Sequence, residues 1–146
     1  MGITPASGNR THCVEGTWGA QIVDELHPQD GEHLIAKKGF GGFSNTPLDA
    51  VLRNLGVTTC VVSGVTTCVC VSTTVRGGLE YNYRMILVSD AVAEVDRDTH
   101  AAELRTMSRV FADVLRRIAD HPASRLHELL PWHWKTLNLN DQANAA

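Results

Sequence analysis

Hydrophobic positions along the chain follow two spacings, which predicts that strands alternate with helices. Residues 33–36, 57–62 and 83–89 are short runs rich in apolar and β-branched side chains, as in buried strands. Residues 48–55 and 99–119 instead repeat apolar side chains every three or four positions, as on one face of a helix. Alternating strands and helices imply right-handed crossovers and a parallel sheet, with ligands at the carboxyl ends of the strands.

Helix-start and turn residues refine several of these elements. Thr46 and Pro47 provide a cap and a first helical residue for the helix that follows, and Gly56 ends it. A shorter helix is predicted over residues 17–26, where apolar side chains again recur at helical spacing. The glycine pair at 77–78 is expected to close the element before it.

The stretch from residue 63 to 71 contains Cys70, the candidate nucleophile. Cys70 follows a strand-like segment, at a point where a helix could begin, and the first turn of a helix stabilises a thiolate through its N–H groups and dipole. The same N–H groups could hold an oxyanion. Two alternatives stay open: propensity alone favours a second strand over residues 68–75, and a cysteine among Val and Thr is often a small buried apolar residue.

Length, composition and charge limit the possible classes. At 146 residues, with 43% hydrophobic and 20% charged residues, the chain suits one globular domain with a real core. A net charge of −3 without a basic cluster argues against nucleic acid as a partner. No apolar run reaches the roughly 18 residues of a membrane span, and the first residues lack a signal-peptide pattern, so we expect no membrane association and a cytoplasmic location.

The cysteines and histidines do not predict a metal site. Cys13, Cys60, Cys68 and Cys70 lack zinc-type spacing, and free thiols are the better interpretation. The histidines at 121, 127 and 133 are six residues apart and do not share one face of a helix. We therefore predict no metal.

Several segments share their residues and spacing with a known family. They are residues 16–19 (Gly-Thr-Trp-Gly), 23–26 (Val-Asp-Glu-Leu), 42–49 (Gly-Phe-Ser-Asn-Thr-Pro-Leu-Asp), 64–76 (Gly-Val-Thr-Thr-Cys-Val-Cys-Val-Ser-Thr-Thr-Val-Arg) and 88–91 (Val-Ser-Asp-Ala), together with Lys37. In this pattern the chain resembles the isochorismatase-like cysteine hydrolases, and among them the ureidoacrylate amidohydrolases and their relatives. The agreement runs from about residue 12 to residue 120.

The resemblance implies a fold and a reaction. The fold is a three-layer α/β/α arrangement around a parallel sheet, in which Cys70 begins the helix after its strand and acts as the nucleophile, with Lys37 as its catalytic partner. A cis peptide between Val65 and Thr66 would aim the N–H of Thr66, with that of Cys70, into an oxyanion hole. The implied substrate is a small amide or ureido compound, whose C–N bond is hydrolysed through a thioester without a cofactor.

The same resemblance implies that one part is missing. The family's general base is an aspartate at the end of the first, central strand, and this sequence begins after that region, so we expect the strand to be absent. Asp24, Asp30 and Asp90 do not occupy the motif, and none is assigned the role. Either the start is assigned too late or the chain is a remnant with little activity; we favour the former because Lys37 and Cys70 fit the pattern.

The chain is expected to comprise an irregular segment (1–16), the partial hydrolase domain (17–120) and an extension (121–146) that ends in a frayed tail. Trp18, Phe40 and Phe43 suggest an apolar wall for the substrate, although either phenylalanine ring also suits core packing. A gap in the sheet would favour a homo-oligomer, and a non-catalytic scaffold that self-associates is the main alternative function. A redox role for Cys68 and Cys70 is a third option, weakened by their spacing.

Overall fold

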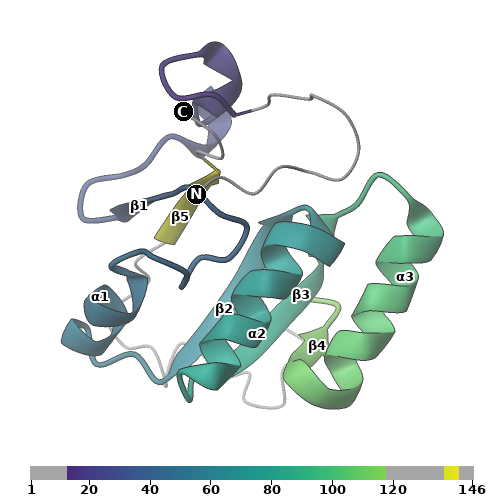
Figure 1. Cartoon of the computed structure of the whole chain (residues 1–146). Helices are drawn as coiled ribbons and strands as arrows, with labels where there is room; N and C mark the ends of the chain where they lie inside the picture. Colours follow the sequence, from purple (N-terminus) through teal and green to yellow (C-terminus); the bar gives the residue numbers. More distant parts are fainter. Residues whose placement is uncertain (1–12, 118–136, 142–146) are drawn as a thin grey trace.

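The structure is a computed structural model that describes residues 13–117 and the strand at 137–141 (Figure 1). In chain order its elements are η1 (Trp18–Ala20), η2 (Asp24–Leu26), β1 (His33–Lys37), α1 (Leu48–Asn54), β2 (Thr59–Val65), η3 (Thr67–Val71), α2 (Ser72–Glu80), β3 (Arg84–Ala93), α3 (Arg97–Thr106), η4 (Met107–Phe111), β4 (Asp113–Leu115) and β5 (Leu137–Asp141). η1 and η2 are single 3-10 turns, whereas η3 and η4 are π-helical turns.

The strands form two parallel sheets. β2, β3 and β4 make one sheet with β3 in the middle, and the residues of β3 from Met85 to Val88 are buried because the strand has neighbours on both sides and α2 lies across the sheet (Figure 1). β1 pairs with β5, from His33 opposite Leu137 to Lys37 opposite Asp141. The predicted α/β class with a parallel sheet is confirmed.

One hydrophobic core joins the two sheets. Ile35 of β1 and Leu87 of β3 belong to the same buried cluster as Leu52 of α1, Val75 of α2 and Met107 of η4. Because protein interiors are close-packed, shared core side chains fix the positions of the elements that carry them. β1 is therefore held at a defined place beside the β2–β3–β4 sheet.

α1 forms where the turn residues predict it. The Thr46 hydroxyl accepts a hydrogen bond from the N–H of Leu48 at 3.2 Å, and Leu48 and Leu52 are buried. Gly56 follows the helix with a φ of +67°, a left-handed conformation that favours glycine. The helix thus begins and ends on local signals, and its apolar face joins the core.

The helix predicted over residues 99–119 is wrong for residues 112–117, and residues 118 and 119 lie outside the described part of the chain. The backbone becomes extended at Ala112, with φ −154° and ψ 155°, and Val114 then pairs with Leu87 in β4. Val and Leu are apolar in either conformation, so their spacing does not distinguish the last helical turn from a short strand. Residues 113–115 form a strand because they pair with β3.

The prediction that Gly77 and Gly78 close their element is also wrong, because both lie within α2, which continues to Glu80. A Cβ atom at Gly78 would lie 2.5 Å from Met85 Sδ and 3.1 Å from Phe43 Cε2. The glycine therefore permits close packing of the helix on β3 instead of ending it.

Two further expectations about the ends of the chain need correction. The helix predicted over residues 17–26 is replaced by the separate turns η1 and η2, with extended backbone at Gln21 and Val23 between them. Leu26 is exposed, so its apolar side chain does not pack into the core as the helical spacing would require. The expected tail contains a strand, since β5 pairs with β1; the histidines at 121, 127 and 133 lie outside the described residues.

Within the described part of the chain, no helix is both long and apolar enough to cross a membrane.

Candidate active site

Cys70 lies in η3, between the end of β2 and the start of α2, and is half-buried. The chain leaves β2 through Gly64, whose φ of +114° is accessible to glycine, and then through a cis peptide bond between Val65 and Thr66, the position at which the sequence resemblance implies one. The Thr66 carbonyl accepts hydrogen bonds from two amides of η3, each at 3.2 Å. Helix is thus the conformation around Cys70, and the strand alternative is wrong.

Thr74 connects the turn of Cys70 to the loop that follows β1. Its hydroxyl donates to the Cys70 carbonyl at 2.7 Å and accepts from the N–H of Gly42 at 2.9 Å. The loop also approaches closely at Gly41, where a Cβ would lie 2.9 Å from Thr73 Cγ2. The loop after β1 therefore packs on the first turn of α2, next to Cys70.

Lys37 is the last residue of β1 and is only 3% exposed. Its ammonium group donates to the carbonyl of Gly39 at 3.0 Å. The loop that begins at Lys37 is the one that packs on α2, so Lys37 and Cys70 lie toward the same end of the fold. Buried lysines are rare and mark positions where a positive charge has a function or a partner.

Cys68 has a different environment from Cys70, although it is only two residues away. Its thiol donates to Glu94 Oε2 at 2.7 Å, and its N–H donates to the same oxygen at 3.0 Å. The hydrogen bond to Glu94, followed by burial, raises the pKa of the Cys68 thiol to about 11. The bond from Cys68 in turn holds the pKa of Glu94 below its ordinary value. Cys68 is therefore a protonated donor at neutral pH, not an activated thiolate.

The four cysteines within residues 13–117 are thiols and form no disulfide with one another. Burial raises the pKa of Cys60 to about 11, so this thiol also stays protonated near neutral pH. Two of the four cysteines are thus unsuited to act as nucleophiles.

A second group of polar contacts holds η3 against α3. Thr67 is fully buried, and its hydroxyl donates to the carbonyl of Ala93 at 3.0 Å and lies 2.9 Å from His100 Nδ1. Arg76 forms a 2.8 Å ion pair with Glu103. These contacts position the turn that carries Cys70 from the side opposite the β1 loop.

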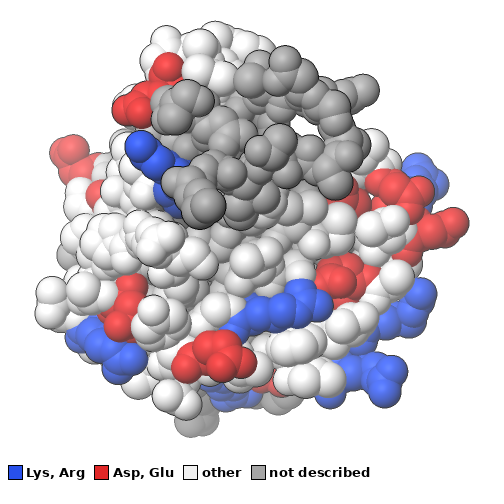
Figure 2. Space-filling model, in the orientation of Figure 1, with Lys and Arg blue, Asp and Glu red and all other residues white. Residues whose placement is uncertain are grey.

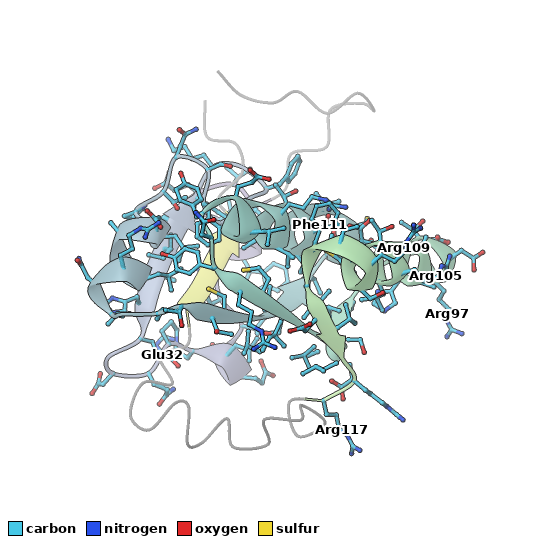
Figure 3. All side chains as sticks on the ribbon, turned by 90° about the horizontal axis from the view of Figure 1, so that it is seen from below. Glu32, Arg97, Arg105, Arg109, Phe111 and Arg117 are labelled. Atoms are coloured by element: carbon cyan, nitrogen blue, oxygen red, sulfur yellow. The ribbon has the colours of Figure 1, made fainter. Side chains whose placement is uncertain are left out.

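Arg76 also connects α2 to η4, because its guanidinium lies 4.5 Å from the ring centre of Phe111. Figure 3 shows Arg97, Arg105 and Arg109 projecting from the outer side of α3 and η4, whereas Phe111 lies beside α2. Along this segment Met107 is buried and Phe111 is half-buried, whereas the apolar Val110 is 66% exposed, so the predicted apolar face is only partly buried.

The three predicted wall residues occupy different environments. Phe43 is buried in the core, with its ring stacked 5.4 Å from that of Tyr81 and tilted 5.6 Å from that of Tyr83. Trp18 is 86% exposed, and Phe40 is half-buried. Core packing accounts for Phe43, and the contribution of Trp18 and Phe40 to a substrate wall stays a prediction.

Metal ligands do not gather in the described part of the chain: no group of three or more His, Cys, Asp or Glu side chains there could hold an ion.

Comparison with known proteins identifies the family. A family model described as "Isochorismatase domain" matches residues 1–119. The chain belongs to the isochorismatase family. The family resemblance inferred from the motifs is therefore confirmed.

Relatives in this family include ureidoacrylate amidohydrolases. RutB of Methylobacterium radiotolerans is 39% identical over 104 residues, which cover 70% of this chain and 40% of that protein. RutB of Klebsiella pneumoniae is 44% identical over 78 residues, or 53% of this chain and 33% of that protein. The chain thus spans less than half the length of these relatives.

Solved structures of the family share the fold. An isochorismatase-like hydrolase from Alkaliphilus metalliredigens matches with a TM-score of 0.69 and 38% identity over 71% of this chain and 57% of that one. N-carbamoylsarcosine amidase from Thermoplasma acidophilum matches with a TM-score of 0.65 and 35% identity over 71% of this chain and 59% of that one.

Three polar residues around η3 make contacts that the sequence pattern did not predict. Thr74 lies in a matched segment, but a threonine inside a helix gives no signal that its hydroxyl bridges two segments. Glu94 and His100 follow the end of β3, and residues just beyond the carboxyl end of a parallel strand are where ligands and polar side chains collect. That rule could have indicated both.

Proposed function

We propose that this chain carries the nucleophile site of a cysteine hydrolase that cleaves the C–N bond of a small amide or ureido compound. The observation that supports it most is the hydrogen-bonded connection from Gly42 through Thr74 to Cys70, which joins the loop of Lys37 to the turn of the candidate nucleophile. The names of the relatives, ureidoacrylate amidohydrolase and N-carbamoylsarcosine amidase, support this substrate class.

In the proposed reaction, the Cys70 thiolate attacks the substrate carbonyl and forms a C–S bond. The N–H groups of Thr66 and Cys70 hold the oxyanion, and the positive charge of Lys37 stabilises the thiolate. The C–N bond then breaks as the nitrogen takes up the proton that the Cys70 thiol released when the thiolate formed, so the amine leaves and a thioester remains. Water hydrolyses the thioester to the acid and restores the thiol.

The face of the molecule seen in Figure 2 carries charges of both signs. Figure 2 shows acidic and basic side chains interspersed on the visible face, without a large patch of one sign. A face of this kind does not steer a charged ligand over long distances.

The proposal is tested with Cys70→Ser and, as a matched control, Cys68→Ser. With ureidoacrylate and N-carbamoylsarcosine as substrates, Cys70→Ser should lower kcat/KM by roughly 10³-fold or more, since a nucleophile is essential. Cys68→Ser should stay within a few-fold of the wild type. Iodoacetamide near neutral pH should label Cys70 faster than Cys60 or Cys68, as mass spectrometry would show.

The proposal fails if Cys70 is labelled no faster than the other cysteines and Cys70→Ser turns over substrate like the wild type. Oligomers in light scattering without any turnover would instead support the scaffold function.

A further inference from the structure

The turn that carries Cys70 is capped by a side chain from another strand. Thr66 precedes η3, and its own side chain caps none of the amides of this turn. The first amides of a helix have no partner within the helix, and a side-chain oxygen usually accepts from one of them. Here the oxygen is Oε2 of Glu94, just beyond the end of β3, which accepts from the N–H of Cys68 at 3.0 Å.

The pairing of β2 with β3 brings Glu94 to this place. The register of the ladder shifts between Val62 and Gly64 of β2, where β3 carries extra residues. Such an irregularity lets a strand leave the ladder and rejoin it. The pairing then ends with Ala93 opposite Val65, the last residue of β2. Glu94 therefore follows at the point where β2 passes into the turn of Cys70.

The carboxylate of Glu94 is held by several hydrogen bonds. Its Oε1 accepts from the N–H of Val95 at 2.9 Å, and its Oε2 accepts from the Cys68 thiol at 2.7 Å as well as from the Cys68 N–H. The side chain of Thr66 forms a further hydrogen bond with Glu94. These bonds, that of the Cys68 thiol first, hold the pKa of Glu94 below its ordinary value. Glu94 is thus an ionised acceptor of fixed orientation that contacts both ends of the segment 66–68.

The residue between these two contacts is fixed from the same strand. Thr67 is fully buried, and its hydroxyl donates to the carbonyl of Ala93 at 3.0 Å. Residues 93 and 94 therefore hold three consecutive residues of the turn, 66–68. The N–H of Thr66, one of the two donors proposed for the oxyanion, belongs to this segment. Such a donor is effective only when it lies about 3 Å from the position that the oxyanion takes.

We propose that Glu94 is a positioning residue of the Cys70 site, whose carboxylate caps η3 from the end of β3 and so holds the N–H of Thr66 in place for the oxyanion. This inference rests on the proposed function. Glu94 acts through the turn: it contacts no reacting atom and transfers no proton. Its removal should therefore change the turnover step and not the binding of the substrate.

Glu94→Met and Glu94→Gln in the full chain are the main test. Both side chains are uncharged and of similar length, but only glutamine offers an oxygen to the N–H of Cys68. With ureidoacrylate as substrate, Glu94→Met should lower kcat about 10- to 100-fold and leave KM within about threefold, because a misplaced oxyanion donor weakens the transition state alone. Glu94→Gln should recover most of this loss. A kcat of Glu94→Met within about twofold of the wild type, or an equal loss in both variants, would overturn the proposal.

Asp96→Ala is the matched control, because it removes a cap of the same kind from the next helix. Asp96 Oδ2 accepts from the N–H of Thr99 at 2.6 Å at the start of α3, which carries none of the proposed reacting groups. Glu94→Met and Asp96→Ala should both lower the melting temperature by a few degrees, but only Glu94→Met should lower kcat. An equal loss of kcat in both would mean that stability, not positioning, explains the effect.

Amide hydrogen exchange, followed by NMR, provides a readout that needs no turnover. In Glu94→Met the Cys68 amide should exchange about tenfold faster than in the wild type, and the Thr99 amide should not change, whereas Asp96→Ala should show the reverse. Glu94→Ala serves in both measurements if Glu94→Met folds poorly. Unchanged exchange at Cys68 would reject the anchoring by Glu94. Faster exchange in a protein whose wild type turns over no substrate would keep the anchoring and reject the proposed function.

Discussion

The two sheets of this protein are assembled differently. β2, β3 and β4 follow one another along the chain, and β3 between them is buried from Met85 to Val88. β1 instead pairs with β5, which comes from the far end of the described chain. The first sheet carries the turn of Cys70, and the second carries Lys37. The candidate site therefore combines a locally assembled part with a part that includes a long-range strand pairing.

The polar contacts around η3 also differ between its two sides. On the side of β3 and α3, Thr67 and Cys68 are held by Ala93, His100 and Glu94. On the side of β1, the hydroxyl of Thr74 accepts a hydrogen bond from the N–H of Gly42, in the glycine-rich loop at 39–42. The first side fixes the turn of Cys70, and the second packs the loop that follows Lys37 on α2.

The largest effect is expected in the locally assembled sheet. Leu87 is fully buried in β3, so Leu87→Ala should lower the free energy of unfolding by about 3 kcal/mol. Leu34→Ala in β1 removes the same atoms from a side chain that is 56% exposed, and should cost less than about 1 kcal/mol. Denaturant unfolding measures both, and equal losses would contradict the assignment of the main core to β3.

A smaller effect is expected where the two parts meet, at Gly78. Phe43 from the β1 loop and Met85 from β3 both touch the site of its missing side chain. Gly78→Ala should destabilise the protein by about 2 kcal/mol, because both neighbours are buried and must move. The same unfolding measurement would show the effect.

Gly77→Ala is the matched control for this change. A Cβ there would lie 3.4 Å from the nearest atom of Phe43, an ordinary contact, and alanine should add about 0.5–1 kcal/mol through its helix propensity. If both variants behave alike, close packing is not the reason for Gly78.

These two glycines show what the sequence could and could not predict. Strands β1, β2 and β3, helix α1 and the position of Cys70 are recoverable from apolar spacing, local caps and motif matches. A glycine pair usually ends a helix, and only the contact with Met85 shows that Gly78 does the opposite. Local patterns identify an element, but its neighbours decide where it ends.

β5 illustrates the same limit over a longer distance. Leu137 and Leu139 alternate with Asn138 and Asn140, a spacing of two that is typical of a strand. Five residues with two asparagines are too weak a signal to stand against the expectation of a tail, and the partner strand lies far away in the sequence. The pairing of β5 with β1 therefore has no signal in the local sequence pattern.

The smallest effect concerns the two cysteines of η3. Glu94→Gln removes the charge that stabilises the Cys68 thiol, so the pKa of Cys68, now about 11, should fall toward its ordinary value. Because a fall of one unit gives tenfold more thiolate, iodoacetamide at pH near 8 should label Cys68 roughly tenfold faster. Cys60 is the internal control, since burial alone raises its pKa to about 11, and its rate should not change. An unchanged Cys68 would mean that burial, not Glu94, keeps this thiol protonated, and the contrast between the two sides of η3 would then lose its electrostatic basis.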